Sequence, residues 1–222
     1  MSGVPVITVD GPSGVGKGTL SHRLVERLGF NFLDSGAIYR ALAWGVLHAG
    51  HAPDDEAAVV ALARHLPVRF QDGRVWFEDE DITDAIRTEQ VAGVASKVAA
   101  IPAVREALLQ RQRDFARPPG LVADGRDMGT VVFPEAQVKL FLDASPEVRA
   151  ERRHKQLKEK GLDANIDEIV REIRERDARD RNRAVAPLVP ADDAVVIDTS
   201  DLSIDEVVER ACEVIRARGI DC

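Results

Sequence analysis

The first fifty residues alternate short apolar runs with amphipathic segments, a pattern typical of a parallel α/β sheet. Residues 6–9 form an apolar, β-branched run that predicts a buried strand, and a glycine-rich turn follows it. Leucines then recur at every fourth position over residues 20–28, which predicts a helix that stops at Gly29. A second strand is expected at residues 30–33, followed by another helix that extends to about His48.

The pattern changes near residue 66, where antiparallel character replaces the alternation of strand and helix. Two apolar and aromatic runs, residues 68–70 and 75–77, flank Asp72-Gly73. Glycine supplies the positive φ that a tight hairpin turn needs, so this segment predicts a hairpin. A hairpin inside an α/β chain indicates an inserted subdomain of roughly residues 66–85. Further helices are expected at residues 54–65, around 91–98 and from Pro102.

The second half of the chain returns to buried strands and capped helices. Three apolar runs predict strands, at residues 121–123, 138–142 and 195–197. Three polar residues are placed to cap helices, namely Ser145 before Pro146, Asn165 with Glu168, and Ser203 with Glu206. The last of these helices carries an apolar stripe that includes Val207, Ala211 and Ile215.

The helix expected after Asn165 changes character along one face. Isoleucine and valine form an inward stripe over residues 166–173, and the same helical spacing then reaches Arg176, Asp180 and Arg183. Charges in that position belong either to a salt-bridged surface or to a polar cleft. A cleft that binds a charged ligand explains the change better.

Composition limits the classes of function. With 222 residues, the chain suits one domain with insertions or two small domains. The net charge of −8 argues against a protein that coats nucleic acid or an anionic membrane. No leader segment or membrane-length apolar run is visible. Because the two cysteines, Cys212 and Cys222, lie at the end of the chain, we expect no disulfide framework and a reducing cytoplasmic location, with Cys212 packed beside the final stripe.

Arginine is abundant despite the acidic total, since six lysines among thirty basic residues leave 24 arginines. The guanidinium fork binds phosphate in a bidentate manner, which makes these residues candidates for phosphate ligands. Codon bias in an arginine-favouring genome is the alternative explanation.

A phosphate-binding loop lies between the first predicted strand and helix. It matches the pattern G-x-x-x-x-G-K and comprises Gly11, Pro12, Ser13, Gly14, Val15, Gly16, Lys17, Gly18 and Thr19. Glycines let backbone N–H groups point at a phosphate, the helix adds its positive dipole end, and Lys17 supplies a charge for the β- and γ-phosphates. The alternative is an ordinary glycine turn. Gly18 follows the lysine, so the hydroxyl that usually coordinates Mg²⁺ is displaced by one position to Thr19.

Two further polar loops follow predicted strands, at residues 34–40 and 124–129. Ligands of open α/β sheets bind outside the carboxyl ends of the strands. We therefore expect these loops and residues 10–19 to converge on one crevice.

Five segments of the sequence resemble the bacterial-type cytidylate kinase family, within the nucleoside monophosphate kinases. They are Asp10–Thr19, Leu33–Arg40, Val104–Gln112, Ala123–Phe133 and Arg176–Pro190. The resemblance covers nearly the whole chain, and Gly-Lys-Gly-Thr is this superfamily's own form of the loop. It implies a single α/β domain over residues 1–222, with a P-loop core whose parallel sheet is flanked by helices. It further implies a monophosphate-binding insertion at about 36–100, with a small antiparallel sheet, and a mobile lid at about 149–165.

The resemblance also implies an activity, the transfer of the γ-phosphoryl group of ATP to CMP or dCMP with Mg²⁺. The expected partners are these nucleotides, with no nucleic acid and no membrane, and the expected state is a monomer in the cytoplasm. By matching motif, the acceptor phosphate is contacted by Ser35, Arg40, Arg126 and Arg183. Cytosine is read by Ser96, Arg105 and Asp127, and the ribose is contacted by Arg176 and Asp180. Arg153 joins the phosphate loop in binding ATP.

The expected chemistry is positioning and charge stabilisation rather than proton transfer. Lys17, Arg126 and Arg183 are the expected catalytic cations, with help from a lid arginine among Arg149, Arg152 and Arg153. We expect no metal-ligating residues in the protein itself. A carboxylate, assigned to Asp127, can accept from the exocyclic amine that cytosine has and uracil lacks. The alternatives are a kinase for another monophosphate or a small metabolite, and a non-catalytic ATP-binding module.

Overall fold

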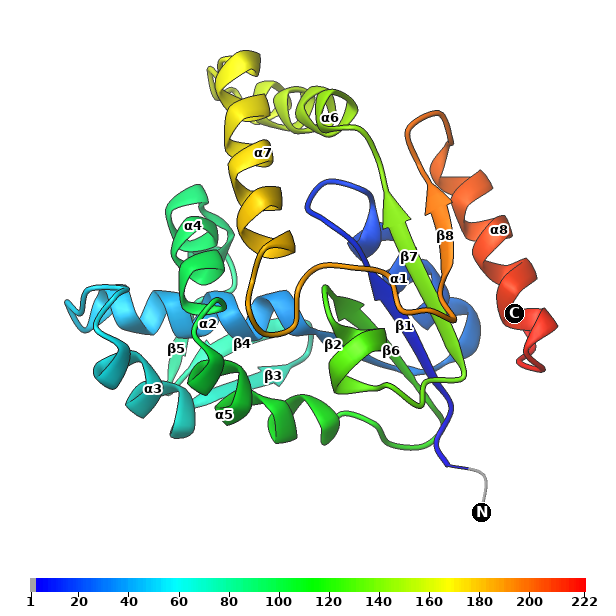
Figure 1. The fold of residues 1–222 in the computed structure, drawn as a ribbon, viewed down its shortest axis with the longest axis horizontal. Helices are drawn as coiled ribbons and strands as arrows, with labels where there is room; N and C mark the ends of the chain where they lie inside the picture. Colours follow the sequence, from blue (N-terminus) through cyan, green and yellow to red (C-terminus); the bar gives the residue numbers. More distant parts are fainter. Residues whose placement is uncertain (1–2) are drawn as a thin grey trace. The chain divides into compact units, whose positions relative to one another are not determined.

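The chain folds into two units, each with a sheet of its own (Figure 1). The computed structural model describes residues 3–222. Unit 1 comprises the chain up to Leu33 together with Asp114–Cys222, and unit 2 comprises Asp34–Arg113. The predicted α/β fold is confirmed, with a parallel sheet flanked by helices and a smaller antiparallel sheet.

The large sheet has five strands in the order β2-β6-β1-β7-β8. Their bounds are β1 Val6–Asp10, β2 Asn31–Asp34, β6 Leu121–Gly125, β7 Val138–Asp143 and β8 Val195–Asp198. The central strand β1 pairs in parallel with β6 and β7, and its last residue, Asp10, lies opposite Gly125 and Phe141. Every residue of β1 and β6 is buried, as expected of parallel strands covered on both faces. The register brings the phosphate loop, which follows β1, beside the turn that follows β6.

Over the residues of unit 1 that the structure describes, there are four α-helices and one π-helix. They are α1 Lys17–Leu28, α6 Pro146–Glu159, α7 Ile166–Arg181, α8 Ile204–Ala217 and the π-helix Met128–Val132. The predicted caps are confirmed, because Ser145 accepts from Val148 N, and Ser203 forms a reciprocal capping box with Glu206. Apolar side chains of α1 and α8 share one core with β1 and β7. The π-helix was not predicted, since its sequence carries no periodic signal of its own.

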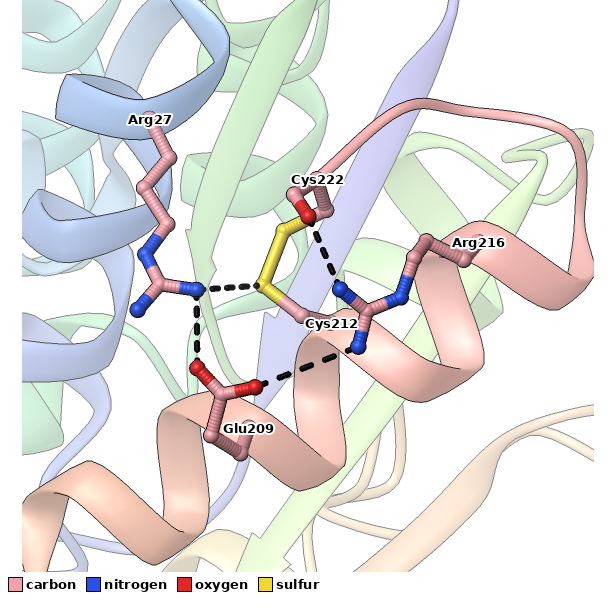
Figure 2. The surroundings of a disulfide bond; sticks show 5 residues. All are labelled: Arg27, Glu209, Cys212, Arg216 and Cys222. Atoms are coloured by element: carbon pink, nitrogen blue, oxygen red, sulfur yellow. Dashed lines mark hydrogen bonds and ion pairs between the residues drawn. A yellow bond between two sulfur atoms is a disulfide. The ribbon is translucent and has the colours of Figure 1, made fainter.

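A disulfide closes the end of the chain, a pairing that the sequence analysis did not predict. Cys212 is fully buried on α8, as expected, and its Sγ is bonded to Cys222 (Figure 2). Arg27 of α1 donates to Glu209 at 3.0 Å and to Cys212 Sγ at 3.4 Å. Arg216 donates to Cys222 O at 3.0 Å. The bond and the Arg216 contact attach Cys222 to α8, and the Arg27 contacts join α1 to α8.

Unit 2 combines four helices with the small sheet. Its elements are α2 Ser35–His48, α3 Glu56–Arg64, α4 Glu89–Val98, α5 Pro102–Arg113, a 3₁₀ turn at Ala85–Arg87, and the strands β3 Val68–Gln71, β4 Arg74–Phe77 and β5 Glu80–Asp81. The predicted hairpin is confirmed, with φ values of 53° at Asp72 and 73° at Gly73. The third strand, β5, was not predicted because it is only two residues long. At Gly45, an added Cβ would lie 2.7 Å from the Phe77 ring, so glycine permits the close approach of α2 and β4.

Across residues 3–222, none of the helices has the length and apolar character needed to span a membrane.

Candidate active site

The phosphate loop connects β1 to α1 through a backbone that depends on glycine. Gly11, Gly14 and Gly16 have φ values of 149°, 76° and 93°. A Cβ added to Gly11 would lie 2.2 Å from the carbonyl oxygen of Leu142, so no larger residue fits there. The loop therefore has the turn chemistry that lets successive backbone N–H groups surround an anion.

Lys17 is the first residue of α1 and is only 9% exposed. Its Nζ donates to the carbonyl oxygen of Pro12 at 2.9 Å, within the same loop. Burial lowers the pKa of the Lys17 ammonium to about 8, and the Asp124 carboxylate opposes this shift. The side chain thus remains largely protonated at pH 7. Gly18 and Thr19 follow it on the exposed side of the first helical turn.

Two of the three expected lid arginines contact the outside of the phosphate loop. Arg149 donates through Nε to the carbonyl oxygen of Ser13 at 2.5 Å, and Arg152 donates to that of Gly14 at 3.4 Å. Arg149 is 1% exposed. Arg153 is half-buried on the same helix, α6, and burial lowers its pKa. The guanidinium of Arg149 is enclosed by protein, so among the three arginines expected to help in the lid, Arg149 is the buried one.

Asp10, the last residue of β1, is hydrogen-bonded to the turn after β6. The sequence analysis did not predict this contact. Its two carboxylate oxygens accept from the backbone N–H groups of Met128 and Gly129, both at 2.8 Å. Burial raises the pKa of the Asp10 carboxyl to about 7, although the two N–H donors favour the ionised form. The signal available in the sequence was a carboxylate at the end of a buried strand, directly before Gly11.

Arg126, Asp180 and Arg183 form a buried charged cluster in unit 1. Arg126 Nε lies 2.8 Å from Asp180 Oδ2, and Arg183 Nη1 lies 3.8 Å from Asp180 Oδ1. Their side chains are 17%, 4% and 3% exposed, respectively. Arg183 also donates twice to the carbonyl oxygen of Ala186, at 3.1 and 2.7 Å. Asp127, in the same turn as Arg126, is 3% exposed. Two guanidinium groups around one carboxylate leave a net positive charge that suits an anionic ligand.

The apolar stripe predicted at residues 166–173 of α7 is confirmed only in part. Ile169 is buried, but Ile166 is 37% exposed, because it begins the first turn of the helix away from the core. The helix ends at Arg181, so Arg183 lies beyond it, although its side chain returns to Asp180. Arg176 is half-buried. Asp180 and Arg183 are buried and so do not belong to a solvated surface, whereas the ligand-binding cleft expected here is still a prediction.

Unit 2 carries the other four predicted acceptor residues. Ser35 is the first residue of α2, and its Oγ donates to Gln112 Oε1 at 2.6 Å. Arg105 of α5 donates to the carbonyl oxygen of Ala99 at 3.0 Å, and its guanidinium lies over the Tyr39 ring at 5.2 Å. Arg40 is half-buried on α2 and Ser96 is buried on α4. Gln112 was missed as a partner of Ser35, because the two residues are 77 positions apart.

A resident metal has no obvious site in the part of the chain that the structure describes. Within residues 3–222, no three His, Cys, Asp or Glu side chains gather as a metal would require. Asp124, at the end of β6, accepts from Ser21 Oγ at 3.5 Å and lies near enough to Lys17 to shift its pKa. A single carboxylate suits Mg²⁺ that arrives with nucleotide phosphates.

Comparison with known proteins identifies relatives over nearly the full length. The family model described as cytidylate kinase matches residues 7–217. A protein named cytidylate kinase from Aeromonas hydrophila subsp. hydrophila is 62% identical, over 92% of this chain and 90% of that protein. Another of that name from Klebsiella pneumoniae is 58% identical, over 97% and 96%. Among solved structures, a gluconokinase from Sinorhizobium meliloti 1021 is similar with a TM-score of 0.48 and 17% identity, over 98% of this chain and 94% of that one.

Proposed function

This chain belongs to the cytidylate kinase family, and we propose that it transfers the γ-phosphoryl group of ATP to CMP and dCMP, giving ADP with CDP or dCDP. One observation carries the proposal. The phosphate loop with its buried Lys17 lies in the same unit as the buried cluster of Arg126, Asp180 and Arg183. In-line transfer between two anions needs fixed cations on both the donor and the acceptor phosphate, and this arrangement supplies them.

The donor triphosphate is bound by the loop and the start of α1. Backbone N–H groups of the loop surround the phosphates, and Lys17 exchanges its contact with Pro12 for the β- and γ-phosphates. Mg²⁺ would arrive with these phosphates and would neutralise part of their charge, and Asp124 at the end of β6 is the carboxylate that would hold it. Arg153 contributes a further charge on the ATP side.

The acceptor nucleotide is bound by three groups of residues. Its phosphate is contacted by Ser35, Arg40, Arg126 and Arg183, its ribose by Arg176 and Asp180, and its base by Ser96, Arg105 and Asp127. The attacking atom is an oxygen of the acceptor phosphate, which is already ionised at neutral pH. No general base is therefore required. The buried Asp127 carboxylate gives the site an acceptor for the cytosine amine.

The assignment of an insertion and a lid within the chain rests on the same family relationship. Residues of about 36–100 act as the monophosphate-binding insertion, and residues of about 149–165 act as a lid within a single kinase domain. The lid is built on the charged second half of α6 and the segment before α7. We propose that the enzyme acts on free nucleotides in the cytoplasm as a monomer.

The experiment is to follow γ-labelled ATP into product. Label recovered as CDP when CMP is added, at a rate far above label released as inorganic phosphate, supports direct transfer to the acceptor. Lys17→Ala is the control, and we expect it to fold with an unchanged circular dichroism spectrum and to lose the transfer. Release of labelled phosphate without CDP, or ATP binding with no turnover on any monophosphate, would overturn the proposal.

A further inference from the structure

Four consecutive carbonyl groups of the phosphate loop each accept a hydrogen bond from a side chain, and three of the four donors lie outside the loop. The donors are Lys17 Nζ to Pro12, Arg149 Nε to Ser13, Arg152 Nη1 to Gly14 and Thr199 Oγ1 to Val15, at 2.9, 2.5, 3.4 and 3.0 Å. Lys17 is already assigned to the ATP phosphates, which leaves the contacts of Arg149, Arg152 and Thr199 to the loop without a role. Their regular arrangement, one donor for each carbonyl, points to a function in shaping the loop.

Arg149 is the best anchored of these donors. Its Nη1 and Nη2 bind the two carboxylate oxygens of Asp177 on α7, at 2.6 and 2.7 Å. The side chains of Arg149 and Asp177 are 1% and 15% exposed. The aliphatic part of Arg149 also lies against Gly14, where an added Cβ would be 3.4 Å from Arg149 Cβ. A bidentate pair of this kind fixes the plane of the guanidinium and hence the direction of Nε.

The direction of a held carbonyl determines the direction of the next N–H group. The carbonyl of Ser13 and the N–H of Gly14 belong to one planar trans peptide, so they point in opposite directions. When Arg149 holds the carbonyl outward, the N–H of Gly14 points to the inner side of the loop. The same relation holds for the peptides that follow Gly14 and Val15, whose carbonyls bind Arg152 and Thr199.

We propose that Arg149 and Asp177 are a positioning pair that holds the phosphate loop in its ATP-binding shape. This inference rests on the proposed function in that ATP is taken as the ligand of the loop. Arg149 does not touch the nucleotide, because it is buried and its Nε, Nη1 and Nη2 atoms all donate to protein. The pair also links the loop to α7, the helix that carries Arg176 and Asp180.

The test must separate a positioning role from ordinary stability, because breaking one partner of a buried ion pair is strongly destabilising. Arg149→Lys keeps the charge but loses the fork. The double variant Arg149→Met/Asp177→Leu removes both charges and fills the space, which often restores stability. The matched control is Arg174→Met/Glu147→Leu, an exposed ion pair between the same two helices with no contact to the loop.

For each folded variant, calorimetry gives the affinity for ATP, steady-state kinetics gives KM for ATP and for CMP, and a melting curve gives Tm. We expect both Arg149 variants to bind ATP about tenfold or more weakly, the effect of losing a hydrogen bond from a charged donor, with KM for CMP within twofold of wild type. The double variant should recover Tm relative to Arg149→Lys without recovering ATP affinity. The control double variant should change neither the affinity for ATP nor Tm.

Wild-type affinity for ATP in either Arg149 variant would overturn the positioning role. An equal loss of ATP and CMP binding that follows Tm would also overturn it, since the pair would then be only structural. If the double variant does not fold, Arg149→Lys and Asp177→Asn decide between these outcomes. Failure of the wild-type protein to bind ATP would instead refute the proposed function, so the two failures are distinguishable.

Discussion

Asp180 is the residue whose neutralisation tests the acceptor site most sharply. The substitution Asp180→Asn keeps the shape of the side chain and removes one negative charge from between Arg126 and Arg183. Arg183 remains fixed, because it donates twice to the carbonyl oxygen of Ala186. Arg126 loses its 2.8 Å contact to a carboxylate. The variant should therefore disturb Arg126 more than Arg183.

The magnitude follows from the burial and geometry of that contact. Asp180 is 4% exposed, so solvent does not replace the lost interaction. A hydrogen bond to a charged group contributes about 1.5–3 kcal/mol, and about 1.4 kcal/mol corresponds to a factor of ten. We expect kcat/KM for CMP to fall about 10- to 150-fold, with KM for ATP within twofold of wild type.

A coupled assay of ADP release with CMP and with dCMP measures this effect. If Asp180 acts by holding Arg126, both acceptors lose the same factor. A direct contact to the ribose 2′-hydroxyl instead predicts a larger loss for CMP, because dCMP lacks that group. Asp193→Asn is the control, since that carboxylate is 55% exposed in its ion pair with Lys139. An unchanged kcat/KM for CMP in Asp180→Asn, with the fold intact, would refute the reasoning.

Three further predictions concern buried titratable groups of unit 1. Asp127→Asn should reduce the preference for CMP over UMP much more than it weakens ATP binding, and unchanged selectivity in steady-state kinetics would remove Asp127 from base recognition. With the pKa of Lys17 lowered to about 8, the affinity of the free enzyme for ATP should decline as pH rises above about 8, and a flat calorimetric profile up to pH 9.5 would contradict this. Because burial raises the pKa of Asp10 from 3.8 to about 7, the folded state holds this proton more tightly than the unfolded state. The free energy of unfolding of wild type should therefore fall relative to Asp10→Asn between pH 4 and 7, by up to about 4 kcal/mol, and parallel urea midpoints across this range would count against it.

Features with local signals were predictable from the sequence. The phosphate loop, the caps at Ser145 and Ser203 and the hairpin at Asp72-Gly73 each depend on residues within a few positions of one another. Fold class followed from these because strand, loop and helix alternate in order. The roles of most site residues are still predictions, since they come from the family relationship.

Features that depend on distant residues were not predictable. Asp10 accepts from backbone N–H groups 118 and 119 positions away, and Arg149 reaches Ser13 across 136 positions. Nothing in the local sequence of Arg149 distinguishes it from Arg152 or Arg153, so all three were assigned to the lid. The packing of α6 and α7 decides that Arg149 is buried against Asp177. The disulfide required the chain to turn back after α8, which no periodic pattern indicates.

The measurement that tests the central claim most directly is kcat/KM across the common nucleoside monophosphates with ATP as donor. We expect CMP and dCMP to be phosphorylated far more efficiently than UMP, AMP and GMP, because the role proposed for the buried Asp127 carboxylate is to accept from the cytosine amine. Comparable efficiency on UMP, or a clear preference for a purine monophosphate, would contradict it.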